Sequence, residues 1–460
     1  MRRLRHIYFM SVVCWVSAGL VGCRAIVSWP TLTGEPGLTP SALSASSTVH
    51  ETAVSPGSEK PISSTPAPEV LNTPGSEVQG FTVVYSYDGE LWTWSEGIKN
   101  QILTRGPVYS PEISPDGSII AFLRPVDDFF FELWAINLDG TGERRLVGTA
   151  DLEVIGGSSR DPNAVAIIPH RYKWLPESHT LAFNTEYAYR GPGTVLLDDF
   201  NLVDADTGKL SYTLLTGWGG EFFLSPAGGQ VAISTPTNVI LANLDGSNWR
   251  SVFTYDPVIT YSDYRYYASP AWSPDGSYLL LALPPADPLA EPTESTNLFR
   301  IDVASSSTQK IGQVQSVPFF DTPVQYSPDL NQIAHLASTG GAGENDRSLV
   351  LAFPDGSGIT EYHVGKLLQF LGWNSTSDHF GFSLEEDQQL FIGALNKPAQ
   401  NVNPPLFGVI NMTWINEDQF IYLQGLGEKY NLGLADKFDA NFIIDSVENS
   451  RIEYDFFWKK

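Results

Sequence analysis

The sequence predicts an all-β protein built from repeated four-stranded sheets, and three observations support this prediction. Gly (40) and Pro (32) are abundant, while charged residues make up only 17% of the 460 residues, a balance typical of turn-dense β proteins. The motif Ser-Pro-Asp-Gly occurs at 114–117 and 273–276, each time before an apolar run. Related motifs recur at intervals of 41 to 61 residues. Repeats of about 40 to 50 residues with four strands each are typical of a β-propeller, which we expect over residues 81–460.

The first 22 residues have the pattern of a secretory signal peptide. Arg2, Arg3 and Arg5 precede the apolar segment 7–20, whose 14 residues are too few to cross a bilayer, since a spanning helix needs about 20. The next motif, Leu-Val-Gly-Cys at 20–23, resembles the bacterial lipobox. That resemblance implies cleavage before Cys23 and attachment of a diacylglycerol to its thiol. The alternatives are an ordinary signal peptide and a buried N-terminal helix.

A lipid on Cys23 would determine where in the cell the protein is located. Stable anchoring needs more than one acyl chain, and a diacylglyceryl cysteine supplies two. We therefore expect a body held at a bacterial cell membrane on the extracytoplasmic side. Cys14 lies in the segment that would be removed, so the mature chain would have no disulfide.

Residues 23–80 are expected to form the lipidated cysteine and a disordered tether. Pro, Ser, Thr, Gly and Glu dominate residues 24–78, and such a composition cannot bury enough apolar surface to offset the entropy lost on ordering. As a random coil this segment would span about 40 Å. It is either a spacer that lifts the body from the membrane or a neutral linker, and both predict disorder.

Two repeats define the expected blade. In each, an inner strand ends in the Ser-Pro-Asp-Gly turn, and apolar runs follow at 119–123 and 278–283. A strand that is apolar on both sides must be covered on both faces, as in sheets packed around an axis. Weaker copies of the motif lie at 174–177, 224–228, 326–329, 373–375 and 414–416.

The blade count follows from the two ends of the repeat array. Residues 81–104 offer only three strands (82–87, 90–94 and 101–104), whereas 451–458 is one strand too many. Joined, they would make an eighth blade and remove two exposed sheet edges. We therefore predict eight blades closed by N- and C-terminal strands, with seven as the alternative. In the closing strand Tyr454, Phe456 and Trp458 should share one face.

The repeats at 113–146 and 272–302 resemble the TolB-type and WD40-like (PD40) propeller repeats. The resemblance covers most of residues 81–460 and implies the propeller fold. In TolB itself an α/β domain precedes the propeller, and the tether stands in its place here. Function is therefore not carried over.

Charge and motif content narrow the function classes. The chain has 27 Lys and Arg against 52 Asp and Glu, a net charge of −25, which disfavours nucleic acid as a partner. It contains no Gly-x-Ser-x-Gly elbow and no zinc motif among its seven scattered His, so we expect no catalytic residues, no metal and no cofactor. Segments 137–140, 204–208 and 243–246 resemble fragments of calcium loops, but β-turns fit them better.

One loop and three insertions are candidate binding features. The loop is rich in tyrosine, whose exposed rings suit contact with a glycan or protein, although a loop folded onto the ring is the simpler explanation. The insertions at 149–170, 186–199 and 284–296 would also project from the ring. The candidate binding residues are Tyr255, Tyr261, Tyr264, Tyr266 and Tyr267.

The sequence therefore favours a monomeric, non-enzymatic binding or scaffold protein that contacts a protein, peptide or glycan. The alternative is a propeller enzyme, for example a glycan-cleaving one, with carboxylates in the central channel. A third possibility is an accessory subunit of an envelope complex.

Overall fold

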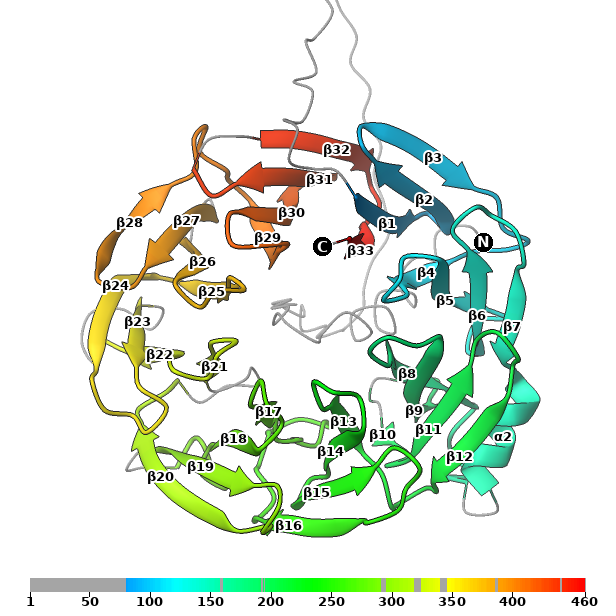
Figure 1. Ribbon diagram of the computed structural model, residues 1–460, viewed down its shortest axis with the longest axis horizontal. Helices are drawn as coiled ribbons and strands as arrows, with labels where there is room; N and C mark the ends of the chain where they lie inside the picture. Colours follow the sequence, from blue (N-terminus) through cyan, green and yellow to red (C-terminus); the bar gives the residue numbers. More distant parts are fainter. Residues whose placement is uncertain are drawn as a thin grey trace, which may run out of the picture. The chain divides into compact units, whose positions relative to one another are not determined.

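Eight antiparallel sheets, each built on four strands and one extended by a short fifth strand, form a closed ring in the computed structural model (Figure 1). The structure describes residues 80–459 except 158–159, 192, 194, 291–294, 318–323, 340–345, 385–387 and 439–440. The predicted signal peptide, Cys23 and the predicted tether up to residue 79 lie outside the described residues. We number the sheets as blades 1 to 8 in chain order and name the four strands of each blade inner, second, third and outer.

The strand order within the blades is regular. In order from the inner to the outer strand, blade 1 consists of β33 (Glu453–Trp458), β1 (Phe81–Tyr87), β2 (Glu90–Ser95) and β3 (Ile98–Ile102), and blade 2 of β4 (Tyr109–Ile113), β5 (Ile119–Pro125), β6 (Phe131–Asn137) and β7 (Arg144–Val147). Blade 3 consists of β8 (Ala166–Trp174), β9 (Thr180–Ala188), β11 (Phe200–Asp204) and β12 (Leu210–Leu214), and blade 4 of β13 (Glu221–Leu224), β14 (Gln230–Ser234), β15 (Asn238–Asn243) and β16 (Arg250–Thr254). Helix α2 (Thr149–Gly156) joins blades 2 and 3, and the short β10 (Val195–Leu196) pairs with β9.

The remaining blades repeat the pattern without additions. Blade 5 consists of β17 (Ala271–Trp272), β18 (Tyr278–Leu283), β19 (Thr296–Asp302) and β20 (Thr308–Val314), and blade 6 of β21 (Gln325–Tyr326), β22 (Ile333–Ser338), β23 (Asp346–Ala352) and β24 (Thr360–Lys366). Blade 7 consists of β25 (Gln369–Trp373), β26 (His379–Leu384), β27 (Gln389–Ala394) and β28 (Lys397–Asn401), and blade 8 of β29 (Val409–Trp414), β30 (Gln419–Leu426), β31 (Lys429–Asp436) and β32 (Asn441–Glu448).

The C-terminal strand closes the ring, which confirms the prediction of eight blades. β33 pairs antiparallel with β1, so that Trp458 lies opposite Phe81, and Phe456 opposite Val83. Tyr454, Phe456 and Trp458 share one face, as predicted, and pack on the core formed with β30 and β31 of blade 8. One predicted strand was misplaced: the outer strand of blade 1 is Ile98–Ile102 rather than 101–104, because the turn at Glu96 and Gly97 is tight enough to start it earlier.

The Ser-Pro-Asp-Gly turns are held by their own side chains. In blade 2, Ser114 Oγ accepts the amide hydrogen of Ile119 at 3.0 Å and donates to Asp116 at 2.6 Å. Gly117 has a φ of 76°, which L side chains adopt with strain. Ser273 and Ser327 make the same bond to an Asp two residues later in blades 5 and 6. The motif recurs because each copy satisfies its own polar groups.

Tryptophans at the end of inner strands join neighbouring blades. The indole N–H of Trp174 donates to the backbone carbonyl of Glu112 in the preceding blade, at 3.2 Å. Trp272, Trp373 and Trp414 donate in the same way to Phe223, Gln325 and Gly372. Each indole, buried in Trp174 and Trp373 and half-buried in Trp272 and Trp414, thereby satisfies its polar atom while its ring packs between sheets.

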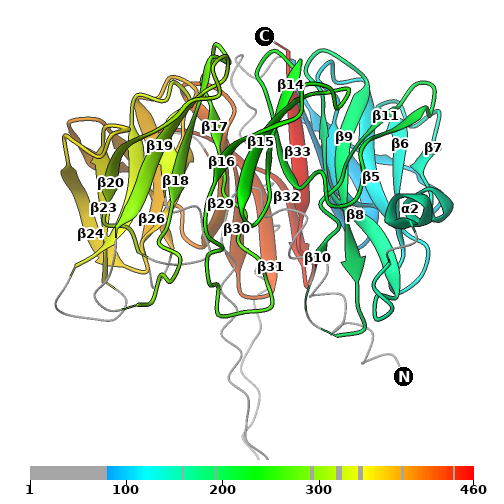
Figure 2. The ribbon, with the colours of Figure 1, turned by 90° about the horizontal axis from the view of Figure 1, so that it is seen from below.

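The antiparallel order gives the ring two different faces. One, which we call the turn face, carries the inner-to-second and third-to-outer turns. It also holds both ends of the described chain, since Lys459 N donates to Gly80 O at 3.0 Å. Figure 2 shows the end of β33 at this edge of the ring. The opposite face, which we call the loop face, carries the second-to-third connections and the links between blades.

Candidate functional site

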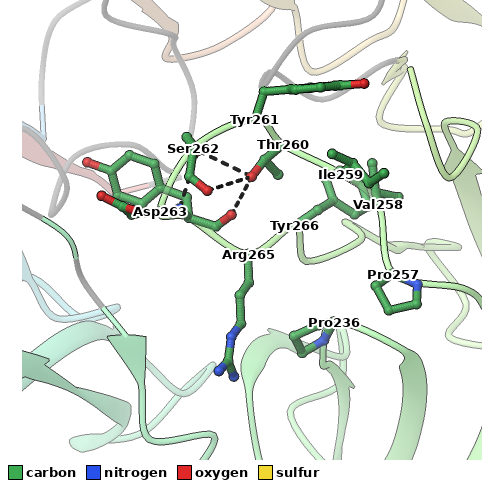
Figure 3. Close-up of a pocket in the computed structure, with 11 residues that line it drawn as sticks. Pro236, Pro257, Val258, Ile259, Thr260, Tyr261, Ser262, Asp263, Arg265 and Tyr266 are labelled. Atoms are coloured by element: carbon green, nitrogen blue, oxygen red, sulfur yellow. Dashed lines mark hydrogen bonds between the residues drawn. The ribbon is translucent and has the colours of Figure 1, made fainter. Parts of the chain in front are cut away.

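The tyrosine-rich loop lies on the loop face between blades 4 and 5. This segment, residues 255–270, which we call the tyrosine loop, links β16 to β17. With Pro236 it lines an open cavity of about 700 Å³ (Figure 3). Tyr261, Tyr264 and Tyr266 are among the lining residues, and the Tyr261 side chain is 60% exposed. Three of the five predicted tyrosines therefore surround one cavity.

The other two predicted tyrosines hold the loop on the ring. Tyr255 is buried in the core between blades 4 and 5, and its hydroxyl donates to the carbonyl of Thr235 at 2.5 Å. The Tyr267 hydroxyl donates to Asp198 of blade 3 at 2.9 Å. Burial raises the pKa of Asp198 to about 6, although the bond from Tyr267 lowers it. Tyr255 and Tyr267 therefore fold the loop onto the ring, which is the simpler of the two explanations considered from the sequence.

The tip of the loop supports its own shape. Thr260 Oγ1 donates to the carbonyl of Tyr264, and Ser262 Oγ donates to Thr260 Oγ1 at 3.2 Å (Figure 3). The Tyr261 hydroxyl donates to Asp287 in blade 5 at 2.6 Å. The aromatic rings are thus presented by a loop fixed at its tip and on both sides, which lowers the entropy lost when a ligand binds.

The three predicted insertions converge on the same arc of the loop face. Residues 149–170 contain α2 and contact 186–199, since Tyr189 donates to Asp161 at 3.0 Å. The insertion 186–199 contacts the tyrosine loop through Asp198. The insertion 284–296 contacts it from blade 5, where Ile259 N donates to Ala286 O at 2.8 Å. Segments far apart in sequence therefore build one surface over blades 3 to 5.

A buried histidine under this surface was not found from sequence. His170 lies between two carboxylates, with Nδ1 2.8 Å from Glu186 and Nε2 2.7 Å from Glu221. It is the extra residue of a β-bulge in β8, because Pro169 pairs with Thr185 while Arg171 pairs with Asn184. Bulges turn a side chain out of the regular alternation, so no sequence pattern pointed to it.

The charges of this cluster stabilise one another. Burial opposes the charge of His170, but Glu186 and Glu221 overcome this effect and raise its pKa to about 10. Burial would raise the pKa of Glu221, yet His170 and Arg171 lower it to about 2. His170 and Glu221 therefore join blades 3 and 4 as an ion pair at neutral pH.

Carboxylates of the inner strands are engaged in contacts between blades. Glu112 of β4 pairs with Lys173 of β8, and burial raises the pKa of Glu112 to about 7 although Lys173 lowers it. From β33, Glu453 accepts the amide hydrogen of Ser110 at 2.6 Å, and Asp455 that of Ile113 at 2.9 Å. None of these residues lines the cavity beside the tyrosine loop.

The segments that resemble calcium loops form turns. Asp139 and Asp245 accept hydrogen bonds from the amides of Thr141 and Ser247, both at 2.9 Å, and Asp204 accepts one from Thr207 at 2.7 Å. Within the described part of the chain, no group of three or more His, Cys, Asp or Glu is placed to hold a metal ion. Nor does any helix there have the length and apolar character to cross a membrane.

The fold defines the class of protein, an eight-bladed β-propeller. No protein family and no curated protein sequence matches the chain. Among solved structures it is similar to TolB from Acinetobacter baumannii, with 12% identity and a TM-score of 0.35, over 82% of this chain and 67% of that one.

The structures of two enzymes are also similar. An oligogalacturonate lyase in complex with manganese has 13% identity and a TM-score of 0.42, over 75% of this chain and 82% of the lyase. Dipeptidyl peptidase 4 from Porphyromonas gingivalis has 11% identity and a TM-score of 0.47, over 73% of this chain and 53% of the peptidase. The chain thus spans about half of the peptidase's length. At such identities the likeness concerns the fold alone.

Proposed function

We propose that the protein is a membrane-anchored extracytoplasmic binding or scaffold protein whose ligand, a protein, peptide or glycan, docks on the loop face over blades 3 to 5. The observation that carries the proposal is that the tyrosine loop, which lines the cavity with Pro236, contacts two of the long insertions, 186–199 and 284–296, while the third contacts 186–199. Rigid scaffolds commonly place their binding residues on such loops.

The lipobox-like motif supplies the anchoring part of the proposal. With a lipid on Cys23, the chain would lead from the membrane to Gly80, which lies on the turn face. The loop face is on the other side of the ring. Its tyrosine loop would then be open to a ligand that does not have to pass between the ring and its own attachment point.

The carboxylates paired with His170 and Lys173 do not support the catalytic alternative. A glycosidase needs two carboxyl groups about 5 to 9.5 Å apart that face the substrate. Glu186 and Glu221 are instead occupied by His170, and Glu112 by Lys173. A binding role needs none of these groups to be free.

The anchor is tested by the substitution Cys23→Ala. We expect the variant to be released into the medium or to remain uncleaved, because the lipid cannot be attached. Fractionation of cells and the mass of the mature protein measure both outcomes. A variant that stays at the membrane and is processed normally would show that Cys23 is not the anchor.

The binding site is tested separately by a photo-crosslinking residue in place of Tyr261 in the full chain in native membranes. We expect a discrete adduct at this position. The matched control is Tyr212 on the outer strand β12, which is 40% exposed and lies outside the tyrosine loop, and which should give none. Equal adducts at both positions, or none at either, would refute the proposed site.

A further inference from the structure

Exposed large apolar side chains are concentrated on the loop face. Of the eight links between blades, six carry at least one among their described residues. Two second-to-third connections and the end of β30 add more. On the turn face the described inner-to-second turns carry none, and the third-to-outer turns carry Trp249, Phe353 and Ile359, with Ile98 at the start of β3. The loop-face residues are Leu103, Val126, Val154, Leu215, Trp218, Ile259, Tyr261, Leu289, Leu367, Phe407 and Leu426.

These residues extend far beyond the tyrosine loop. Leu103 is 80% exposed in the link between blades 1 and 2, and Phe407 is 40% exposed between blades 7 and 8. Each lies three blades away from Tyr261, in opposite directions around the ring (Figure 1). A ligand confined to the cavity would leave both of them in water. Single exposed apolar side chains are ordinary on a protein surface, and what distinguishes this face is that they recur in six of its eight links between blades.

The charged residues of the same loops favour one kind of partner. Exposed carboxylates are frequent, among them Asp127, Asp128, Asp256, Asp263 and Glu428. Positive charge in the described loops of this face comes from arginine, and lysine occurs only at the strand ends that flank them, as Lys366 of β24 and Lys429 of β31. Aromatic residues and arginine are enriched in protein interfaces, and lysine is depleted. The acidic excess repels anionic lipid headgroups and attracts a basic surface.

We propose that the loop face docks a folded protein that covers the ring from blade 1 to blade 8, with an apolar contact area and a basic rim. This inference rests on the proposed function and names its partner class. The apolar loop residues would supply the desolvated contacts, with Trp218, Tyr261 and Phe407 as aromatic anchors. The exposed carboxylates would accelerate association and set its salt dependence.

Photo-crosslinking residues placed one at a time at Leu103, Tyr261 and Phe407 of the full lipidated chain in native membranes test the width of the contact. One and the same protein should form the adduct at all three positions. The controls are Phe353 and Ile359, which are 51% and 68% exposed but belong to the third-to-outer turn of blade 6, and they should give no adduct.

The protein identified in those adducts is then purified and titrated against the full chain in detergent. Leu103→Ser combined with Phe407→Ser should weaken binding about tenfold or more, and the Kd should rise with salt. The control pair Phe353→Ser and Ile359→Ser should change the Kd less than about twofold. The melting temperatures of both double variants should equal that of the unchanged chain, which would show that the four substitutions leave the fold intact.

Several outcomes would overturn the inference. An adduct at Tyr261 alone would confine the ligand to the cavity and leave the proposed function standing. Adducts between two copies of this chain would identify a self-association surface. Adducts with lipid, together with sedimentation on vesicles of phosphatidylethanolamine and phosphatidylglycerol, would identify a membrane contact. The inference would also be contradicted if Leu103→Ser combined with Phe407→Ser left the Kd unchanged.

Discussion

At the scale of single residues, two histidines show how burial determines the contribution of the same type of contact to the free energy of unfolding. His170 and His179 each lie between two carboxylates at hydrogen-bond distance. The His170 side chain is 10% exposed, whereas the carboxylates beside His179, Asp116 and Asp206, are 54% and 58% exposed. Removing one partner of a buried pair costs about 3 to 5 kcal/mol, while an exposed pair contributes about 1 kcal/mol or less.

We predict that His170→Gln lowers the free energy of unfolding by about 3 to 5 kcal/mol near pH 6, because Glu186 and Glu221 lose the charge between them. The pKa of His170 is about 10 in the folded protein and about 6.5 in an unfolded chain. Because the folded value is raised, the stabilisation is complete below about pH 6.5 and disappears as the pH rises toward 10. Chemical denaturation from pH 6 to 10 measures this.

The matched variant His179→Gln should change the free energy of unfolding by about 1 kcal/mol or less over the same range, since water screens its partners. If both variants lost the same stability, or if the loss in His170→Gln did not shrink toward pH 10, the ionised cluster would not be a stabilising contact between blades 3 and 4.

At the scale of elements, the Ser-Pro-Asp-Gly turn shows how one motif serves different neighbours. Gly117 in blade 2 and Gly276 in blade 5 occupy the same turn position, with φ of 76° and 70°. A Cβ on Gly117 would lie 2.5 Å from the Phe457 ring of β33, whereas a Cβ on Gly276 would have nothing within 4 Å. Both turns therefore have the same backbone strain, but only the turn of blade 2 lies against the closing strand β33.

We therefore predict that Gly276→Ala costs about 1 to 2 kcal/mol from the positive φ alone. Gly117→Ala should cost about 1 to 3 kcal/mol more, because its methyl group overpacks against Phe457. Denaturant unfolding of the two variants measures the difference. Equal costs would mean that the turn of blade 2 does not press on β33.

At the scale of the whole molecule, β33 carries the closure of the ring. Its aromatic side chains pack on blade 8 through Tyr454, Phe456 and Trp458 and on blade 2 through Phe457. Complete burial of one large aromatic side chain contributes about 1.5 to 3 kcal/mol, and four half-buried ones together contribute several kcal/mol. Domains are usually stable by only about 5 to 15 kcal/mol, so this one strand carries a large share of the stability.

We predict that truncation after Ser450 gives an aggregating or markedly less stable protein, because it removes these contacts and opens two sheet edges. Truncation after Trp458 keeps β33 and should melt close to the full chain, as should deletion of residues 24–78. Calorimetry and light scattering compare the three. Melting of the Ser450 truncation at the temperature of the full chain would refute the role of closure.

The sequence by itself determined the fold to a large extent. The repeated turn motif and the surplus strand at 451–458 predicted eight blades and their closure. The turn is satisfied by its own neighbours in the chain, and a surplus strand at one end of the array matches a missing strand at the other. The insertions and the tyrosine loop were also visible as departures from the repeat. The outer strand of blade 1 was misplaced, since Ile98–Ile102 is mostly exposed and lacks an apolar pattern.

Only the tertiary structure decided which of these features belong together. His170, Glu186 and Glu221 are separated by up to 51 residues and meet because a bulge turns His170 toward blade 4. Tyr255 and Tyr267 could not be told apart from Tyr261 by composition, since only packing buries one ring and exposes another. The spread of apolar residues over one face likewise follows from ring closure, which places loops from distant repeats on the same side.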